Sequence, residues 1–502
     1  MQATKQARRL NYNHIYGMVE ETMHLISPLS KDSISMTTKL SYIDHVCQRT
    51  QTNPCLKPLV DYLVKEPRFR SRVHILDIHS SPSSVFQAVE IPDEEISRIY
   101  QHSPLVCTRI VLVENINSRL VSQIGEALDI DPLFFAGHII TDFKDIENAP
   151  LPPSLATLPS IAAEKGYLNI HFQQVLDLGS SATFRNMAYS LKSDSNTPRN
   201  VRRLPSLFGR QLGLGRGCCS MLVKRLKETS ICLLLVDPPI THVQAELQRT
   251  FPATRLHGGI EDFEQSASSN AVSYQSADKY WNNHSMLSCL LHYFGSNHST
   301  FQDVPVTILG LAYYPVRIIL NEWNVYTSLV SRYSKYYEYS ISDMTYRLHN
   351  DDIIDLQRWR RRSQQSQHKL TALVDFINFQ LDEEPKQKRW TLVLQDIRYL
   401  QRQIEIYSIS LEQMLAVATS MVQILDSRRS IVEALHIKRL TYVALVFIPL
   451  SWVASLFSMG EGFLPGQEFF WIYFCISLPL VVFVLLLSAT PYHKLSKLCK
   501  RK

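Results

Sequence analysis

Two uncharged runs of twenty residues near the C-terminus constrain this chain more than any other feature. The first is Leu440 to Met459 and the second is Phe469 to Ser488. As a helix rising about 1.5 Å per residue, each run crosses the roughly 30 Å hydrocarbon layer of a bilayer. Only Gly460 to Glu468 lies between them. The sequence therefore predicts a transmembrane hairpin with a short external turn.

The distribution of Lys and Arg predicts the orientation of this hairpin. The turn has no basic residue, whereas both flanks are rich in them, and basic flanks stay on the cytosolic side. The basic residues are Arg428, Arg429, Lys438 and Arg439 before the first run, and Lys494, Lys497, Lys500, Arg501 and Lys502 after the second. We therefore expect a two-pass protein of the lipid bilayer with both termini in the cytosol. The plasma membrane is the first expectation and an organelle membrane the alternative.

A long helix is predicted to lead into the first run. From Lys386 to Ile448 there is neither Gly nor Pro, and 63 residues as one helix extend about 95 Å. Stepping by sevens from Ile397 and from Leu400 gives an almost entirely apolar heptad seam that ends at Leu435. This seam predicts either a coiled coil between chains or packing of the helix against its own domain.

The region before this helix combines strand and helix patterns. Apolar, β-rich runs at Cys107–Val113, Leu168–Val175 and Ser230–Val236 alternate with helical patterns, which predicts a mixed α/β domain. Segments 192–217 and 253–285 are rich in Ser, Asn, Gly and charged residues, and we expect them to be flexible insertions. The fold class is thus an α+β membrane protein. Its expected parts are an N-terminal extension (1–100), the cytosolic α/β domain with flexible basic insertions (101–311), a helical stalk (312–439), transmembrane helix 1 (440–459), the external turn (460–468), transmembrane helix 2 (469–488) and a basic cytosolic tail (489–502).

Composition argues against several function classes. The nine cysteines form no CxxC pair and have no Cys/His spacing suited to zinc, so no structural metal is expected. The run Gly209 to Gly217 is rich in Gly but lacks the Gly-Lys-Ser/Thr of a phosphate loop. No nucleophile-elbow, kinase or dinucleotide motif is present, so we expect neither an enzyme nor a cofactor. The net charge of +6 is concentrated in short stretches, which does not favour a nucleic-acid partner.

The stalk, the hairpin and the basic tail together resemble the CorA-like divalent cation transporter family. Pro449 matches the family's mid-span proline, and Met459 and Pro465 match its signature glycine-methionine-asparagine and the turn that follows. Ser458 replaces the signature glycine and Gly460 replaces the asparagine, whose side-chain amides form the hydrated-cation filter in family members. The chain is most similar in organisation to divergent members, including many from fungi. The resemblance implies a homopentamer that moves divalent cations, magnesium first among them.

The first predicted span has one face of small and hydroxyl side chains. The residues follow spacings of three and four and are Ala444, Ile448, Ser451, Ser455 and Ser458. Such a stripe predicts either the lining of a pore around a symmetry axis or close helix packing. The expected filter and external turn comprise Met459, Gly460, Glu461, Pro465 and Glu468, of which the two Glu residues would form carboxylate rings at an external mouth. The residues that bind a metal ion cannot be assigned from the sequence.

The sequence therefore supports two alternative functions. One is a homo-oligomeric channel or transporter for hydrated divalent cations, with the first span lining the pore, because two spans alone cannot enclose a water-filled path. The other is a membrane-anchored structural or regulatory protein that keeps the same scaffold without transport. Gly460 is the residue that favours the second.

Overall fold

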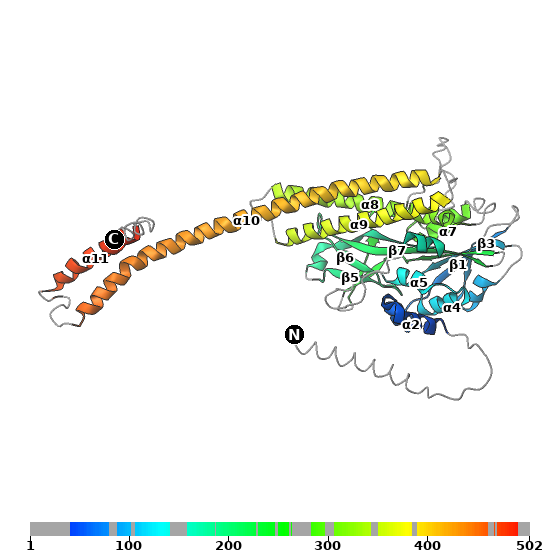
Figure 1. Ribbon diagram of the computed structural model, residues 1–502, viewed down its shortest axis with the longest axis horizontal. Coiled ribbons are helices and arrows are strands. Elements are labelled where there is room, and N and C mark those ends of the chain that lie inside the picture. The colour runs from blue at the N-terminus through cyan, green and yellow to red at the C-terminus, as the bar shows by residue number, and fades with distance from the viewer. Residues whose placement is uncertain are drawn as a thin grey trace, which may run out of the picture.

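The structure is a computed structural model (Figure 1), and a folded head, a long arm and a short helix at the end of the arm make up its shape. It describes residues 41–79, 88–101, 106–140, 158–185, 187–226, 229–245, 249–260, 263, 283–296, 306–342, 350–383, 389–459, 466 and 469–489.

The head is built on an 11-stranded sheet with the strand order β10-β9-β5-β6-β7-β8-β3-β1-β2, in which β4 pairs with β7 and β11. β3 and β8 are parallel at the centre. The other strand pairs in the described residues are antiparallel. The strands are β1 (Arg72–His79), β2 (Val89–Ile91), β3 (Val106–Glu114), β4 (Tyr167–Ser180), β5 (Ser190–Ser193), β6 (Asn200–Arg203), β7 (Arg210–Leu226), β8 (Thr229–Val236), β9 (His242–Gln244), β10 (Thr250–Pro252) and β11 (Thr254–Arg255).

Helices cover both faces of this sheet (Figure 1), so the head has three layers. On one face lie α2 (Tyr42–Thr52), α3 (Lys57–Leu63), α4 (Ser118–Ala127) and α5 (Pro132–Ile139). On the other lie α7 (Met286–Ser296), α8 (Ile308–Ser342), α9 (Asn350–Glu383) and the first half of α10 (Arg389–Phe457). The remaining helices are the short α6 (Pro159–Glu164) and, at the end of the arm, α11 (Phe470–Ala489).

The alternation of side chains along the central strands explains the three layers. Successive residues of a strand point to opposite faces of the sheet. In β3, Val111 and Val113 pack under α2–α5, whereas Ile110 and Leu112 pack under α7–α10. Because both faces are covered, β3 and β8 are buried at almost every position and contain the apolar runs that are usual for strands buried on two sides. The predicted runs at 107–113, 168–175 and 230–236 are confirmed as β3, β4 and β8.

The expected boundary between extension and domain, at residue 101, is too late. β1 lies before it and pairs with β3 over the whole of its length. Tyr42 and Val46 of α2 are buried in the core under the sheet. The sequence of α2 is mostly polar, and only a few of its residues enter the core, so the helix was not recognised from its pattern.

The expected insertion at 192–217 is also wrong, because these residues form the second half of β5, all of β6 and about the first half of β7. The glycines in this run are required by packing: a Cβ on Gly215 would lie 2.7 Å from Ile240 Cδ1, and one on Gly217 would lie 2.7 Å from the ring of Phe172. A strand needs glycine where other side chains lie against its backbone, and such a strand has the same composition as a flexible linker. The segment expected at 253–285 contains β11, and most of the rest lies outside the described residues.

The predicted helical stalk is confirmed as α8, α9 and α10, which pack side by side on the sheet. Each helix contributes one tryptophan that is at most 1% exposed, namely Trp323, Trp359 and Trp390. Burial of a large side chain stabilises a fold by about 1.5–3 kcal/mol. α10 then continues without a break through Pro449, so the apolar run and the packed helix are one element.

Candidate functional site

The far end of α10, with α11 folded back along it, is the candidate site (Figure 1). Among the described helices, α10 is the one whose length and composition would allow it to cross a membrane. The apolar part of α11, Phe470–Leu486, is a shorter helix. The two helices are joined by Tyr473, whose hydroxyl donates to the Leu450 carbonyl at 3.4 Å and whose ring meets Phe457 edge-on.

The contact with α11 covers one face of α10. Val453 is 1% exposed against α11, and Val446, Leu450 and Phe457 on the same side are half-buried. Each residue of an α-helix turns about 100° around the axis, so these four positions form one narrow face. α11 therefore covers a single side of the first span.

The predicted small-residue stripe lies on the opposite side of α10. By the same rotation of about 100° per residue, its five positions point roughly 180° away from Val453. Ile448, Ser451, Ser455 and Ser458 are exposed, and Ala444 is half-buried. The Ser451 hydroxyl donates to the Ile448 carbonyl at 2.9 Å, which leaves its oxygen free to accept a hydrogen bond from outside the helix. The stripe thus remains open to a ligand, a lipid or another chain.

Of the five residues of the predicted filter and turn, the structure describes Met459. Met459 is 84% exposed just after α10 ends. Gly460, Glu461, Pro465 and Glu468 lie outside the described residues. Among the described residues no group of three or more His, Cys, Asp or Glu side chains could hold a metal ion.

The predicted heptad seam divides into two halves. Ile397, Leu400, Ile404 and Leu411 are at most 3% exposed, packed in the core with α8 and α9. Leu425, Val432 and Leu435 are more than half exposed. Between Ala418 and Val453 none of the residues of α10, all of which are described, is buried. The first half of the seam therefore packs against its own domain. The described part of the chain provides no packing partner for the second half.

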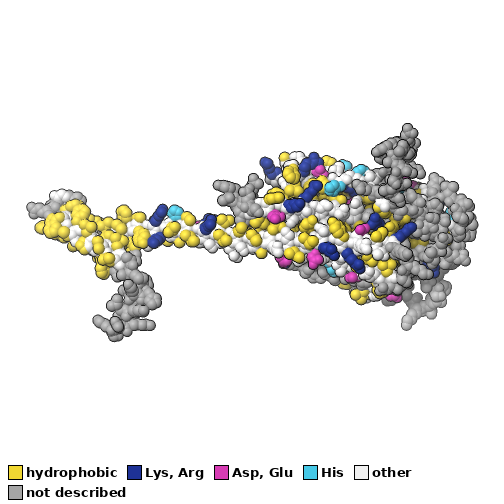
Figure 2. All heavy atoms as spheres, turned by 90° about the horizontal axis from the view of Figure 1, so that it is seen from above, with side chains coloured by type: hydrophobic (Ala, Val, Ile, Leu, Met, Phe, Trp, Pro, Cys, Tyr) yellow, Lys and Arg dark blue, Asp and Glu magenta, His cyan; other side chains and the backbone are white. Residues whose placement is uncertain are grey.

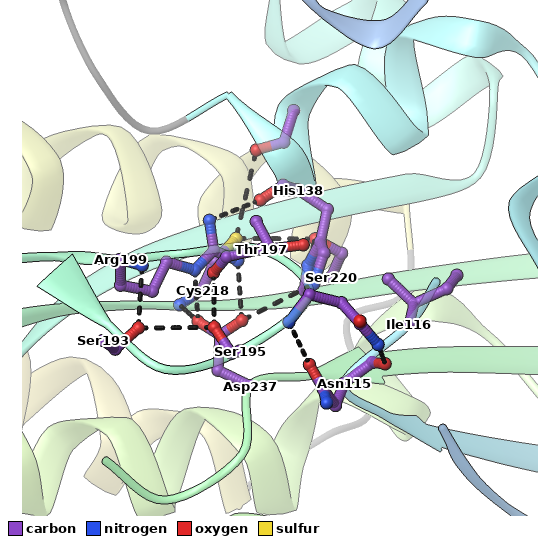
Figure 3. Close-up of polar contacts among 12 residues, drawn as sticks. Asn115, Ile116, His138, Ser193, Ser195, Thr197, Arg199, Cys218, Ser220 and Asp237 are labelled. Carbon is purple, nitrogen blue, oxygen red and sulfur yellow. Dashed lines mark hydrogen bonds and ion pairs between the residues drawn. The ribbon is translucent and has the colours of Figure 1, made fainter. Parts of the chain in front are cut away.

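A buried ion-pair network in the head is a second place where polar side chains converge (Figure 3). Arg199, 1% exposed, donates through Nε and Nη2 to the two carboxylate oxygens of Asp237 at 2.8 and 2.6 Å. Its Nη1 donates to the carbonyl of His138 at 2.8 Å, and the backbone N–H of Cys218 donates to Asp237. The His138 ring lies 2.9 Å from the Ser220 hydroxyl.

The chemistry of this network is structural. Burial, together with Arg199, lowers the pKa of His138 well below its ordinary value, and burial raises the pKa of Cys218 to about 12. A neutral thiol and an inaccessible imidazole are poorly suited to nucleophilic catalysis. Arg199 instead connects the end of β8 to the loop between β5 and β6. Nothing in the sequence indicated the network, because Arg199 lies 61 residues from His138 and 38 from Asp237.

Comparison with known proteins bears on the helical half of the chain. Residues 335–491 match the model of the family described as CorA-like Mg2+ transporter protein. This part of the chain is similar to that family. The matched residues run from the last two turns of α8 through α9, α10 and α11.

Two solved structures align with most of the chain, both with low TM-scores. One is the CorA magnesium transporter from Methanocaldococcus jannaschii, with 10% identity, a TM-score of 0.36, and coverage of 84% of this chain and 98% of that one. The other is the full-length CmaX protein, with 14% identity, a TM-score of 0.33 and the same two coverages. No curated protein matches the chain by sequence.

Proposed function

We propose that this protein is a membrane channel that conducts hydrated divalent cations as a homo-oligomer, with the stripe side of α10 lining the path. Magnesium is the first ion to test, since the matched family is described by Mg2+ transport. The observation that carries the proposal is the division of α10 into two opposite faces, one covered by α11 and one left open. In a ring of such hairpins the open faces would converge on the axis.

The open face of α10 continues well below the predicted span. Further steps of three and four residues from Ala444 towards the cytosol reach positions that are all exposed and uncharged: Thr441, Ile437, Ala434, Ser430, Ser427, Gln423 and Ser420. The charges of this segment lie on the other faces, at Asp426, Arg428, Arg429, Glu433, Lys438 and Arg439. A wall of hydroxyl and small side chains suits a cation that keeps its water shell, because the ligands it meets are its own waters.

The apolar side chains of the arm favour several copies around an axis. Ile424, Leu425, Ile431 and Val432 are 52–60% exposed on the part of the helix that has left its own domain. Exposed apolar rows of this length mark interfaces in soluble segments. A second copy of α10 would cover them, and five copies are the number that the resemblance implies.

The competing function is a membrane-anchored scaffold that does not transport. Gly460 favours it, because glycine offers only its backbone where the family asparagine offers a side-chain amide. Loss of a polar partner for a bound ion costs about 1–3 kcal/mol per group. If the chain conducts, its discrimination between divalent ions should therefore be weak, and Glu461 should supply most of the attraction for cations.

Divalent flux into liposomes tests the proposal. Wild type should pass several divalent cations at similar rates, Gly460→Asn should sharpen the preference for Mg2+, and Glu461→Gln should lower the flux of every divalent ion several-fold. Strong Mg2+ selectivity in the wild type would contradict the filter argument. No flux in any of the three proteins, each shown to be inserted and folded, would favour the scaffold.

A further inference from the structure

We propose that the basic collar of α10, defined as Arg428, Arg429, Lys438 and Arg439, binds anionic phospholipid headgroups at the cytosolic surface of the membrane. The proposal rests on the membrane hairpin and not on ion transport. Figure 2 shows dark blue Lys and Arg side chains along the narrow arm, next to its apolar end.

Two residues of the collar lie at the depth of the headgroups, and the other two lie further into the cytosol. The headgroup layer adds about 5–7 Å to each side of the hydrocarbon core, or about four residues of helix. Lys438 and Arg439 come directly before Leu440, so they lie inside this layer. The ammonium group of Lys438 lies 5.8 Å from the ring centre of Tyr442, an aromatic of the kind enriched at this interface. Arg428 and Arg429 lie about 17 Å below Leu440, which places them within about one Debye length of the lipid surface.

No partner in the described part of the chain neutralises three of these four charges. All four side chains are exposed. Arg429 forms an ion pair with Glu433, Nε to Oε1 3.1 Å. For Arg428, Lys438 and Arg439, the described residues provide no ion pair. The arm has left the folded head at Ala418, so no acidic surface of the domain faces them.

The net positive charge of the chain comes from two short segments of the sequence, one of which contains the collar. Residues 428–439 carry four Lys or Arg and one Glu, and residues 490–502 carry five Lys or Arg and no acid. Their combined charge of +8 exceeds the +6 of the entire chain, so all other residues together carry −2. The 16 residues from Tyr473 to the end of α11 return about 24 Å along α10, which brings Ala489 level with the collar.

A bilayer is the partner whose chemistry fits this arrangement. A surface of phosphates carries distributed negative charge in one plane, and each Lys or Arg near it contributes about fivefold in affinity. The matched control is Arg398→Gln with Arg402→Gln, because both residues are exposed on α10 but lie about 57 Å or more from the span, beyond the reach of screened charge.

The experiment measures which lipids copurify with the full chain from micelles that contain equal amounts of phosphatidylglycerol and phosphatidylcholine. Wild type should retain phosphatidylglycerol in severalfold excess, and 500 mM salt should reduce the excess. Exchange of the four collar residues for Gln should reduce the excess severalfold, whereas the Arg398/Arg402 control should keep it. Glu433→Gln should increase it, because it releases Arg429.

Three results would overturn the proposal: equal retention of both lipids by wild type, an unchanged excess in the collar variant, or loss of the excess in the control. Glycerol phosphate added at millimolar concentration distinguishes a bilayer surface from a site for a soluble phosphate. If it removes the excess at constant ionic strength, the collar is a soluble-anion site and the proposal is wrong. None of these readouts needs ion flux, so a failure of transport leaves them unaffected.

Discussion

The two halves of α10 have the same heptad pattern in opposite environments. From Arg389 to Ala418 one side of the helix lies in the core of the head, whereas from Ile424 to Val443 all its apolar residues are exposed. The helix itself is continuous, so the difference comes from what surrounds it. In the head, intramolecular packing satisfies the pattern; in the arm, the pattern requires lipid or another copy of the chain. A heptad seam therefore specifies that a helix face is covered, but not by which molecule.

The sharpest way to break this comparison is a matched pair of substitutions, Leu411→Asp and Leu425→Asp. Leu411 is 1% exposed, and a carboxylate there would remove an apolar contact and bury a charge, so unfolding of the head should become easier by about 4 kcal/mol or more. Leu425 is 55% exposed, so its substitution should leave the melting temperature of the head within a few degrees of wild type.

The same two variants, measured by light scattering in detergent, test the partner of the arm. Leu425→Asp should lower the mass of the particle, because it places repelling carboxylates in the proposed contact between copies. An unchanged mass with a folded head would show that the arm is covered by lipid or detergent alone.

A second prediction concerns the head, where Arg199 and Asp237 form a buried ion pair, in contrast to the exposed charges of the arm. Asp237→Ala leaves Arg199 buried without a carboxylate and should destabilise the head by about 3–5 kcal/mol, as measured by chemical denaturation. Glu95→Ala, which removes the partner of Arg98 in an ion pair that is exposed on both sides, is the control and should cost at most about 1 kcal/mol. Equal effects of the two substitutions would mean that burial does not govern the cost.

We expect the pH dependence of the free energy of unfolding to arise from two buried histidines in the head. Burial lowers the pKa of His138 well below its usual value and that of His171 to about 3, with Arg199 as a further cause for both. Because the unfolded chain binds these protons near pH 6.5 and the folded chain does not, stability should be constant above pH 6.5 and fall below it. Each histidine should contribute about 1 kcal/mol between pH 6.5 and 5.5.

The double variant His138→Gln, His171→Gln checks this directly. Its free energy of unfolding should lose about 2 kcal/mol less than that of wild type over the same pH interval. The nearby carboxylate of Asp237, 3.7 Å from His138 Nε2, opposes the shift, so a flat wild-type curve would mean that this attraction outweighs burial.

How much of this could be read from the sequence depends on the range of the interactions. The apolar run of α10 and the central strands β3 and β8 were predicted, because a run of one residue type is a local signal. β5, β6 and the first half of β7 were missed, because their glycines and arginines resemble a linker until Ile240 and Phe172 are known to lie against them. The Arg199–Asp237 pair was missed for the same reason.

The stripe side of α10 offers the prediction with the smallest effect on folding. Ser455→Cys and Val453→Cys lie two residues apart, on the open face and on the α11 face respectively. An isosteric change at exposed Ser455 should alter stability by less than about 0.5 kcal/mol. If the stripe lines a water-filled path, a hydrophilic thiol reagent should label Ser455→Cys several-fold faster than Val453→Cys. The native cysteine of α11, Cys475, is exposed, so both variants should be built on Cys475→Ser. If the stripe faces lipid or is closed by tight helix packing, neither cysteine will react, and the pore-lining role of this face would have to be abandoned even if the arm proves to be oligomeric.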